Sequence, residues 1–292
     1  MFRALRHLVA YTLLIALAAG ATAAGSGRAL VLSSDFGTTE RFVASMKGVA
    51  LGVDSNLQVH DLTHHIEPFN IWQASYMLAG TIDYWPEGTV FVSVVDPGVG
   101  TERKSVVART GTGHYVVTPD NGSLTLVADK QGIQEIRQID ESINRMPGSA
   151  ESHTFHGRDV YAYTGARLAA GVIRFEEVGP LLEPKITRLH YQQPKRLDDG
   201  SVAGNITHIE MPFGNVVTNI PSSLVESLGL SPDDNATIFV EISHAGKTVF
   251  QMKIPYARSF GYVDQGKPLL YSDSLQTIGL AVNSGNFAEH YK

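Results

Sequence analysis

The chain has 292 residues, of which 43% are hydrophobic and 18% charged, so it can bury a sizeable core and is too apolar for a disordered protein. Lys and Arg number 23 and Asp and Glu 29, which gives a formal net charge of −6. Without a basic block, this charge argues against nucleic-acid binding, because phosphate neutralisation needs clustered cations. There is no cysteine, which excludes catalytic thiols, thiolate metal sites, disulfides and a cysteine-linked lipid anchor.

Residues 1–24 have the pattern of a signal peptide. Arg3 and Arg6 precede an apolar stretch at 8–19, and small residues follow at 21–23. The apolar stretch is shorter than the ~20 residues of a membrane-spanning helix, although an uncleaved anchor is the alternative. We expect cleavage near Ala23, a periplasmic or secreted protein, and no stable membrane anchor after cleavage.

Short apolar runs alternate with segments of helical period from residue 29 to about residue 182. The run at 89–95, Thr-Val-Phe-Val-Ser-Val-Val, is almost continuously apolar, which is typical of a parallel strand covered on both faces. This alternation predicts a layered α/β domain with a mostly parallel central sheet. We expect strands at 29–33, 57–62 and 89–95, a hairpin at 105–118, and helices at 39–53, 70–85 and 159–170.

The remainder of the chain is mostly strand-like. After Pro184 and Pro194 we expect one short helix, at 221–228, and strands at 201–209, 236–242, 248–254, 268–271 and 277–282. The sequence therefore predicts an N-terminal α/β domain at 25–186 and a smaller, mostly β and barrel-like domain at 187–292.

Polar clusters follow two of the predicted strands, where open α/β sheets bind their ligands. Asp35, in the sequence Ser-Asp-Phe-Gly, could accept hydrogen bonds from both hydroxyls of a ribose. A helix cap or a turn residue is the alternative. Asp96 and Arg103 bound a loop with one proline and two glycines, and they are close enough to pair, either in a site or as a surface ion pair. The loop lacks the Gly-Lys-Ser/Thr ending of a phosphate loop.

His156 lies beside Gly157 at the start of a predicted helix. It is a candidate base whose neutral form the positive helix end would favour, with a structural histidine as the alternative.

The histidines and aspartate at 60–65 suggest a metal site, but their spacing does not match a metallohydrolase. We expect them to support the loop after the second strand, and we expect no metal and no cofactor. The sequence contains no Gly-x-Ser-x-Gly elbow, which argues against a serine hydrolase.

Seven ordered motifs together resemble one family. They are Ser-Asp-Phe-Gly at 34–37, Met-Lys-Gly at 46–48, Asp-Leu-Thr-His at 61–64, the loop 96–103, Thr-Pro-Asp-Asn-Gly at 118–122, Thr-Phe-His-Gly-Arg-Asp at 154–159 and Phe-Gly-Asn-Val-Val-Thr-Asn at 213–219. The chain resembles the S-adenosyl-L-methionine hydroxide adenosyltransferases, the hydrolytic relatives of fluorinase and chlorinase, over nearly all of residues 28–292.

The resemblance implies a homotrimer whose active sites lie between the N-terminal domain of one subunit and the C-terminal domain of the next. It implies attack of water or hydroxide on C5′ of S-adenosylmethionine, which releases adenosine and methionine. The family's catalytic Asp, Arg and His fall on Asp96, Arg103 and His156. Halogenating members of the family carry hydroxyl side chains at the Asp and His positions, and they have an inserted loop between these motifs. Asp96, His156 and the lack of such an insertion in this sequence therefore favour hydrolysis.

The resemblance also assigns substrate contacts. Asp35 matches a ribose-binding aspartate, Phe69 falls where a relative has an aromatic residue on adenine, and Phe213 and Asn215 match adenine-contacting residues.

Ser274 resembles a serine at the methionine end of the substrate. Glu40 and Glu210 stand where halogenating relatives have aspartate near the methionine amino group, and because each is one methylene longer we expect a different spacing in this pocket. An exported adenosine- or S-adenosylmethionine-binding protein without turnover is the alternative function, and a halogenase is a second.

Overall fold

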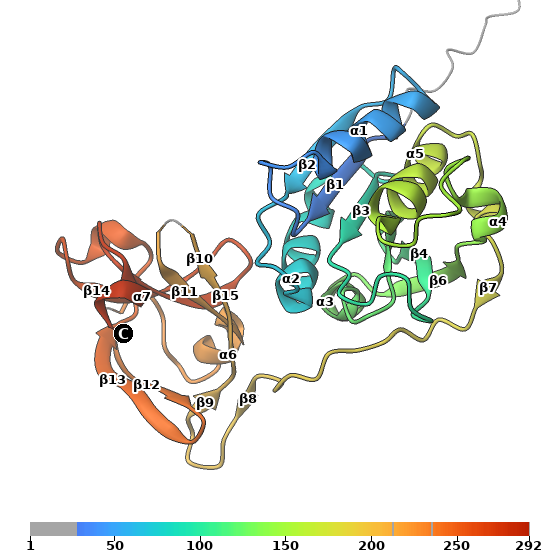
Figure 1. The fold of residues 1–292 in the computed structure, drawn as a ribbon. Helices are drawn as coiled ribbons and strands as arrows, with labels where there is room; N and C mark the ends of the chain where they lie inside the picture. Colours follow the sequence, from blue (N-terminus) through green and yellow to red (C-terminus); the bar gives the residue numbers. More distant parts are fainter. Residues whose placement is uncertain (1–27, 212, 235, 292) are drawn as a thin grey trace, which may run out of the picture.

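The computed structural model describes residues 28–211, 213–234 and 236–291, so the predicted signal peptide at 1–24 lies outside the described residues (Figure 1). An α/β unit is followed by an extended segment at 183–194 and then by a β-rich unit. The predicted fold class is confirmed. In the described part of the chain, no helix is long and apolar enough to cross a membrane.

The α/β unit is built on a seven-stranded sheet of order β2-β1-β3-β5-β4-β6-β7. The first four strands in this order are mutually parallel, and β4, β6 and β7 continue the sheet with antiparallel pairings. The strands are β1 (Leu30–Ser34), β2 (Val59–Thr63), β3 (Val90–Val94), β4 (Ser105–Thr110), β5 (Tyr115–Pro119), β6 (Ile133–Gln138) and β7 (Leu181–Leu182). The predicted hairpin is confirmed as β4–β5.

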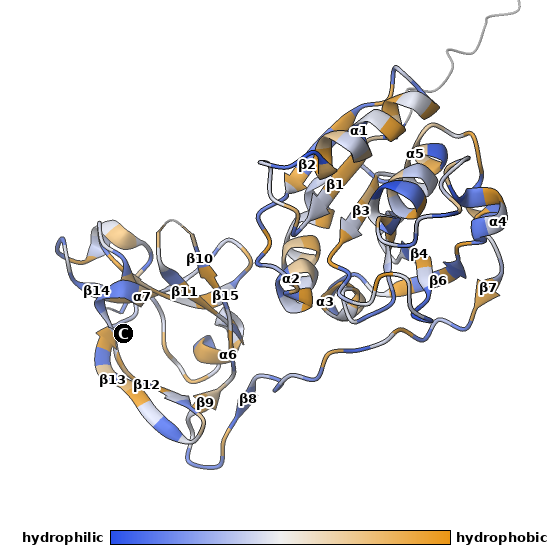
Figure 2. Cartoon of the chain, in the orientation of Figure 1, coloured by the Kyte–Doolittle hydropathy of each residue, from blue (hydrophilic) through white to orange (hydrophobic). Residues whose placement is uncertain are grey.

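Helices cover both faces of this sheet. Successive side chains of a strand point to opposite faces, so Leu30 packs on the side of α1 (Phe42–Val53) and α5 (Tyr163–Ala169), whereas Val31 packs on the other side. That other side is covered by α2 (Ile71–Thr81) and α3 (Thr125–Lys130). Figure 2 shows hydrophobic and hydrophilic residues alternating around these helices, as expected for helices with one buried face.

The β-rich unit encloses a second core. Its sheet of order β10-β11-β15-β14 is antiparallel, and side chains such as Leu280 from this sheet pack against Phe250 and Ile254 of the hairpin β12–β13. Its elements are β8 (Lys195–Arg196), β9 (Val202–Ala203), β10 (Ile206–Glu210), β11 (Asn215–Pro221), α6 (Ser222–Glu226), β12 (Thr237–His244), β13 (Lys247–Pro255), β14 (Pro268–Ser272), β15 (Thr277–Val282) and α7 (Phe287–His290).

Two predicted elements differ in form. The helix expected at 159–170 begins as a π-helical turn, Gly157–Ala162, before α5. The strand expected at 201–209 is broken into β9 and β10 at Gly204, where a side chain would collide with Asn219. The sequence pattern does not predict α3, which is only six residues long. It also does not predict β11 as a strand, although β11 overlaps the family motif at 213–219.

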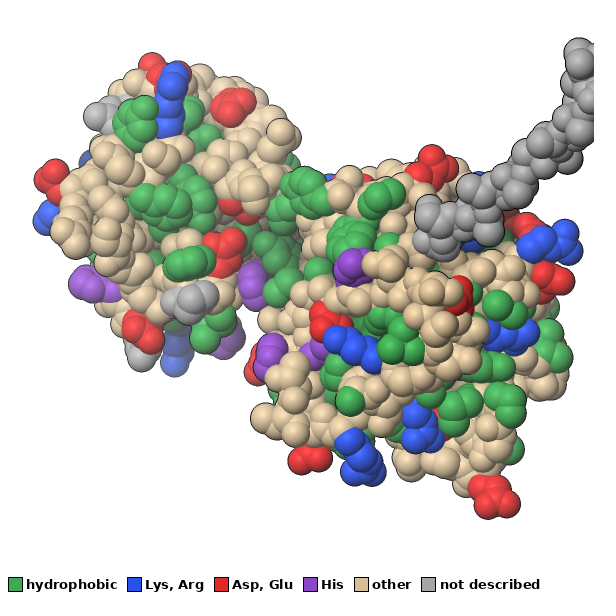
Figure 3. Space-filling view, turned by 90° about the horizontal axis from the view of Figure 1, so that it is seen from above, with side chains coloured by type: hydrophobic (Ala, Val, Ile, Leu, Met, Phe, Trp, Pro, Cys, Tyr) green, Lys and Arg blue, Asp and Glu red, His purple; other side chains and the backbone are tan. Residues whose placement is uncertain are grey.

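The two units touch along α2. Trp72 Nε1 donates a hydrogen bond to the carbonyl oxygen of Thr207 at 2.8 Å, and Tyr76 stacks on His208 with ring centroids 4.9 Å apart. In Figure 3 the two lobes meet in a narrow region where hydrophobic side chains gather. This contact places β10 against the α/β unit of the same chain.

Helix α5 lies close to the sheet because Gly165 has no side chain. A methyl group there would come within 2.5 Å of Val92 Cγ2. We expect Gly165→Ala to lower the free energy of unfolding by about 1–3 kcal/mol, the usual cost of overpacking. Gly48→Ala is the matched control, because Gly48 lies within α1 with open space at its Cβ position and should gain up to about 1 kcal/mol. Urea unfolding measures both, and equal effects would contradict this packing.

Candidate active site

A buried ion pair closes the loop that follows β3. Arg103 Nε donates to Asp96 Oδ1 at 2.8 Å, and Arg103 Nη2 donates to Asp96 Oδ2, so the pairing is bidentate. The two side chains are only 11% and 5% exposed, respectively. The alternative of a surface ion pair is therefore wrong.

Gly100 brings this loop against the segment before His156. Its φ is +76°, and a Cβ atom there would lie 2.9 Å from the carbonyl oxygen of His153. Both the left-handed backbone and the close approach require glycine. The glycine-rich loop thus sets the distance between Arg103 and the histidine segment.

The remaining contacts of Arg103 fix the orientation of its guanidinium group. Nη1 donates to Ser105 Oγ at 2.9 Å, and Nη2 lies 3.1 Å from His156 Nδ1. The ring of Tyr161 lies beneath the guanidinium, 5.6 Å from its central carbon, and its hydroxyl contacts Ser105 Oγ at 3.1 Å. Burial is the largest single influence and acts to lower the pKa of Arg103, but the hydrogen bonds to Asp96 and the charge interactions with Tyr161, Asp96 and Glu141 together raise it.

His156 lies between two arginines. Its Nδ1 faces Arg103, and its Nε2 lies 3.1 Å from Nη2 of Arg145, which in turn donates to Glu141 Oε2 at 2.7 Å. Burial is the largest cause that lowers the pKa of His156; Glu141 and Asp96 oppose it, and the two guanidinium groups add to it. Burial and the two guanidinium groups thus favour the neutral imidazole, in the direction that we expect from its place at the helix start.

Sequence reasoning did not find four of these neighbours. Ser105, Tyr161, Glu141 and Arg145 complete the hydrogen-bond network around the three residues that it did find. Only Glu141 and Arg145 left a signal, the four-residue spacing of a helical ion pair.

The second polar cluster lies at the end of β1. Asp35 Oδ2 accepts a hydrogen bond from the backbone N–H of Phe69 at 2.9 Å. Phe69 has a left-handed φ of 67°, which is strained for a residue with a side chain, and its side chain is 70% exposed. The structure therefore brings two of the predicted substrate-binding residues together and presents an aromatic ring to the surface.

The histidine-rich segment after β2 supports this loop through hydrogen bonds. Ser34 Oγ lies 2.7 Å from His64 Nδ1, His64 Nε2 lies 3.1 Å from Asp61 Oδ1, and Lys47 pairs with Asp61 at 2.6 Å. Within the described ranges, no three His, Asp or Glu side chains gather as a metal site would require. These contacts join the ends of β1 and β2 beside Asp35.

The remaining predicted residues lie elsewhere. Glu40 is exposed ahead of α1. Asn215 Nδ2 donates to Glu210 Oε2 at 2.9 Å across the β10–β11 turn, where Phe213 is 65% exposed. Ser274 is exposed in the β14–β15 turn. Over residues 28–211, 213–234 and 236–291, no hydrogen bond or ion pair joins these five residues to Asp96, Arg103 or His156.

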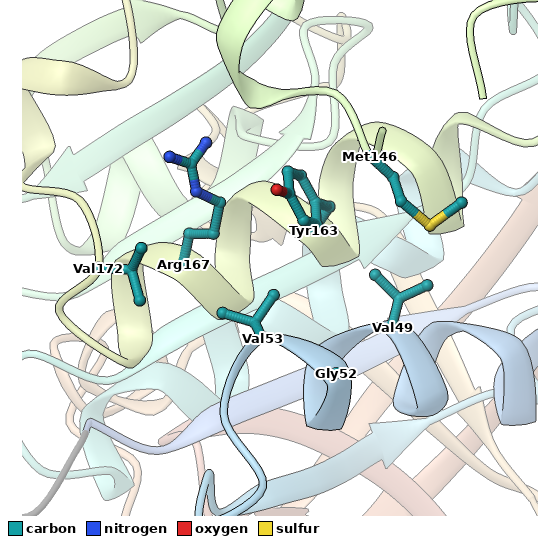
Figure 4. A pocket seen from close by; sticks show the side chains of 7 residues that line it. All are labelled: Val49, Gly52, Val53, Met146, Tyr163, Arg167 and Val172. Carbon is teal, nitrogen blue, oxygen red and sulfur yellow. The ribbon is translucent and has the colours of Figure 1, made fainter. Parts of the chain in front are cut away.

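A pocket lies apart from these groups, between α1 and α5 (Figure 4). Its polar side chains are Tyr163 and Arg167, and the Arg167 guanidinium is held by the Ile143 carbonyl and Asn144 Oδ1. It offers no carboxylate or imidazole, so the candidate active site remains the Asp96 cluster. The other lining residues are Val49, Gly52, Val53, Met146 and Val172.

Comparison with known proteins gives the family. A model of the SAM hydroxide adenosyltransferase N-terminal domain matches residues 30–179, and one of the C-terminal domain matches residues 204–292. The chain belongs to the SAM hydroxide adenosyltransferase family. This confirms the resemblance that the seven motifs indicated.

Relatives with curated names cover most of the chain. A protein from Methanocaldococcus jannaschii named (R)-S-adenosyl-L-methionine hydrolase is 36% identical over 79% of this chain and 80% of its own length. A fluorinase from Actinopolyspora mzabensis is 29% identical over 90% of this chain and 93% of its own. A solved structure of an uncharacterized conserved protein from Thermotoga maritima, 34% identical, superposes with a TM-score of 0.81 over 90% of this chain and 95% of that one.

Loss of either partner of the buried ion pair should destabilise the protein. Asp96→Ala leaves the Arg103 guanidinium buried without its carboxylate, and we expect the free energy of unfolding to fall by about 3–5 kcal/mol. The double variant Asp96→Ala/Arg103→Met removes that uncompensated charge and should recover part of the loss. Urea unfolding tests this, and a double variant that is less stable than the single one would contradict it.

The backbone of Phe69 should show strain that a glycine relieves. Both Phe69→Gly and Phe69→Ala remove the exposed ring, but only glycine accepts the left-handed φ freely. We expect Phe69→Gly to be about 1 kcal/mol more stable than Phe69→Ala. Thermal unfolding of the two variants checks this, and an alanine variant of equal or greater stability would show that position 69 is unstrained.

Proposed function

We propose that the protein hydrolyses S-adenosyl-L-methionine to adenosine and L-methionine by attack of water at C5′. Four curated relatives named (R)-S-adenosyl-L-methionine hydrolase, 33–36% identical to this chain, support the substrate and the product. The observation that carries the mechanism is the buried Asp96–Arg103 pair in contact with His156, whose pKa is lowered chiefly by burial.

The proposed reaction needs no general acid. The water oxygen forms a bond to C5′ as the C5′–S bond breaks, and the sulfonium sulfur takes the bonding electron pair. Methionine leaves as a neutral thioether, so no group must protonate it. One proton is released from the attacking water, and the site must stabilise hydroxide character and accept that proton.

Arg103 can supply the stabilising charge. Of its five N–H groups, two face Asp96, one faces Ser105 and one faces His156; in the described part of the chain, this leaves one on Nη1 for the water oxygen. A guanidinium fixed before the reaction stabilises a developing negative charge without reorganisation. Asp96 orients this guanidinium. Because both ring nitrogens of His156 contact a guanidinium, His156 would accept or relay the proton by exchanging one of these contacts for the water.

Substrate binding is proposed for two groups of residues. Asp35 would bind the ribose hydroxyls, Phe69 would stack on adenine, and Glu40 would lie toward the methionine end. The second group lies in the β-rich unit, where Phe213 and Asn215 would contact adenine, and Glu210 and Ser274 the methionine moiety.

We propose that the two groups meet between subunits of a homotrimer. The exposure of the Phe69 and Phe213 rings supports a shared active site, because a neighbouring subunit could cover them. In this proposal S-adenosylmethionine is the substrate, and the reaction requires no cofactor. Export with cleavage near Ala23 remains part of the proposal and gives a periplasmic or secreted hydrolase.

Isotope labelling tests the reaction directly. The mature protein, residues 24–292, is incubated with S-adenosylmethionine in ¹⁸O-water, with and without chloride, and the products are analysed by mass spectrometry. We expect adenosine labelled at the 5′ oxygen, with at least ~10²-fold slower formation in Arg103→Ala and His156→Ala. A 5′-chlorinated product would indicate a halogenase, and tight adenosine binding without turnover would indicate a binding protein.

A further inference from the structure

The catalytic histidine has a second arginine that the Asp–Arg–His set does not include. Arg145 follows α4 (Glu141–Asn144), and its Nη2 lies 3.1 Å from His156 Nε2. Arg145 Nε and Nη2 both donate to Glu141 Oε2, at 3.1 and 2.7 Å. The arrangement around His156 is therefore nearly symmetric: a carboxylate-bound guanidinium lies at each ring nitrogen.

This symmetry restricts the protonation of the imidazole. A guanidinium can only donate hydrogen bonds, and a neutral imidazole has one nitrogen that accepts and one that carries hydrogen. An imidazolium would direct N–H groups at both guanidinium groups and accept from neither. The geometry disfavours the charged form from both sides, whereas Arg103 alone would act on one side only.

We propose that Arg145, held by Glu141, is a positioning residue that keeps His156 an uncharged base oriented toward Arg103. The proposal rests on the proposed function for its consequence in catalysis, but the state of His156 can be measured without turnover. Arg145 also donates to the carbonyl oxygens of Ser149 and Ser152, so it holds the segment that leads to His156.

The charges that face His156 come from three parts of the fold. Asp96 and Arg103 bound the loop after β3, and Glu141 and Arg145 lie in and after α4. On its own helical turn the charged residues are Arg158 and Asp159, which pair with each other at 2.6 Å. The two guanidinium groups lower the pKa of His156, Glu141 and Asp96 raise it, and burial is the largest cause of the net decrease.

The two members of the second ion pair should therefore shift His156 in opposite directions. Arg145→Gln removes a cation, so the pKa of His156 should rise and the acidic limb of the kcat/KM–pH profile should move up by about one unit. Glu141→Gln removes an anion and should move the same limb down. Arg145→Lys keeps the charge and should restore most of the wild-type limb.

The experiment combines this profile with ¹⁵N spectra of the histidine side chains, in which His156→Gln assigns the signal. Arg137→Gln is the matched control, because Arg137 also donates to carbonyl oxygens, those of Glu176 and Gly179, but does not contact His156. It should shift neither readout.

An unchanged His156 midpoint in folded Arg145→Gln, or shifts of the same sign in Arg145→Gln and Glu141→Gln, would overturn the proposal. If the wild-type protein does not hydrolyse S-adenosylmethionine, the proposed function fails, while the spectra still test the role of Arg145.

Discussion

A guanidinium group removed from water must meet a carboxylate and find acceptors for its other N–H groups, and the candidate active site is built around this requirement at Arg103. Asp96 takes two of the N–H groups, Ser105 takes a third, and His156 meets a fourth. Gly100 allows the loop to approach the histidine segment closely enough for this contact. The charge is thereby fixed in place before any substrate arrives, which is how an enzyme stabilises a developing oxyanion at low cost.

The parallel strands determine where this site can form. β1, β2 and β3 run in the same direction, so Asp35, Asp61 and Asp96, at or just beyond their carboxyl ends, lie along one edge of the sheet. The Ser34–His64–Asp61 hydrogen bonds hold that edge together, and Asp35 accepts the backbone N–H of Phe69 there. In the proposed mechanism the sheet would supply the catalytic half of the site, and the proposed trimer would supply the other half from a neighbouring β-rich unit.

Much of this could be predicted from residues that obey local rules. The run at 89–95 is almost continuously apolar because both faces of β3 are covered, and the oppositely charged Asp96 and Arg103 are joined by a short glycine-rich loop. The four-residue spacing of Glu141 and Arg145 indicates their ion pair, but the contact of Arg145 with His156 could not be predicted, because it depends on how the segment 145–156 folds back. The left-handed backbone of Phe69 leaves no pattern in a sequence. The break between β9 and β10 falls at Gly204, where a Cβ atom would lie 2.5 Å from Asn219 Oδ1, a residue distant in the sequence.

In the proposed mechanism Arg103 acts on the reacting water and not on the binding of the nucleoside. Adenosine affinity by calorimetry, measured beside the single-turnover rate of S-adenosylmethionine hydrolysis, separates these roles in the wild-type protein and in Arg103→Ala. For Arg103→Ala we expect a single-turnover rate reduced by about 10²-fold or more, with adenosine affinity changed by less than about threefold. Loss of adenosine affinity in proportion to the rate, or hydrolysis that continues unchanged, would contradict it.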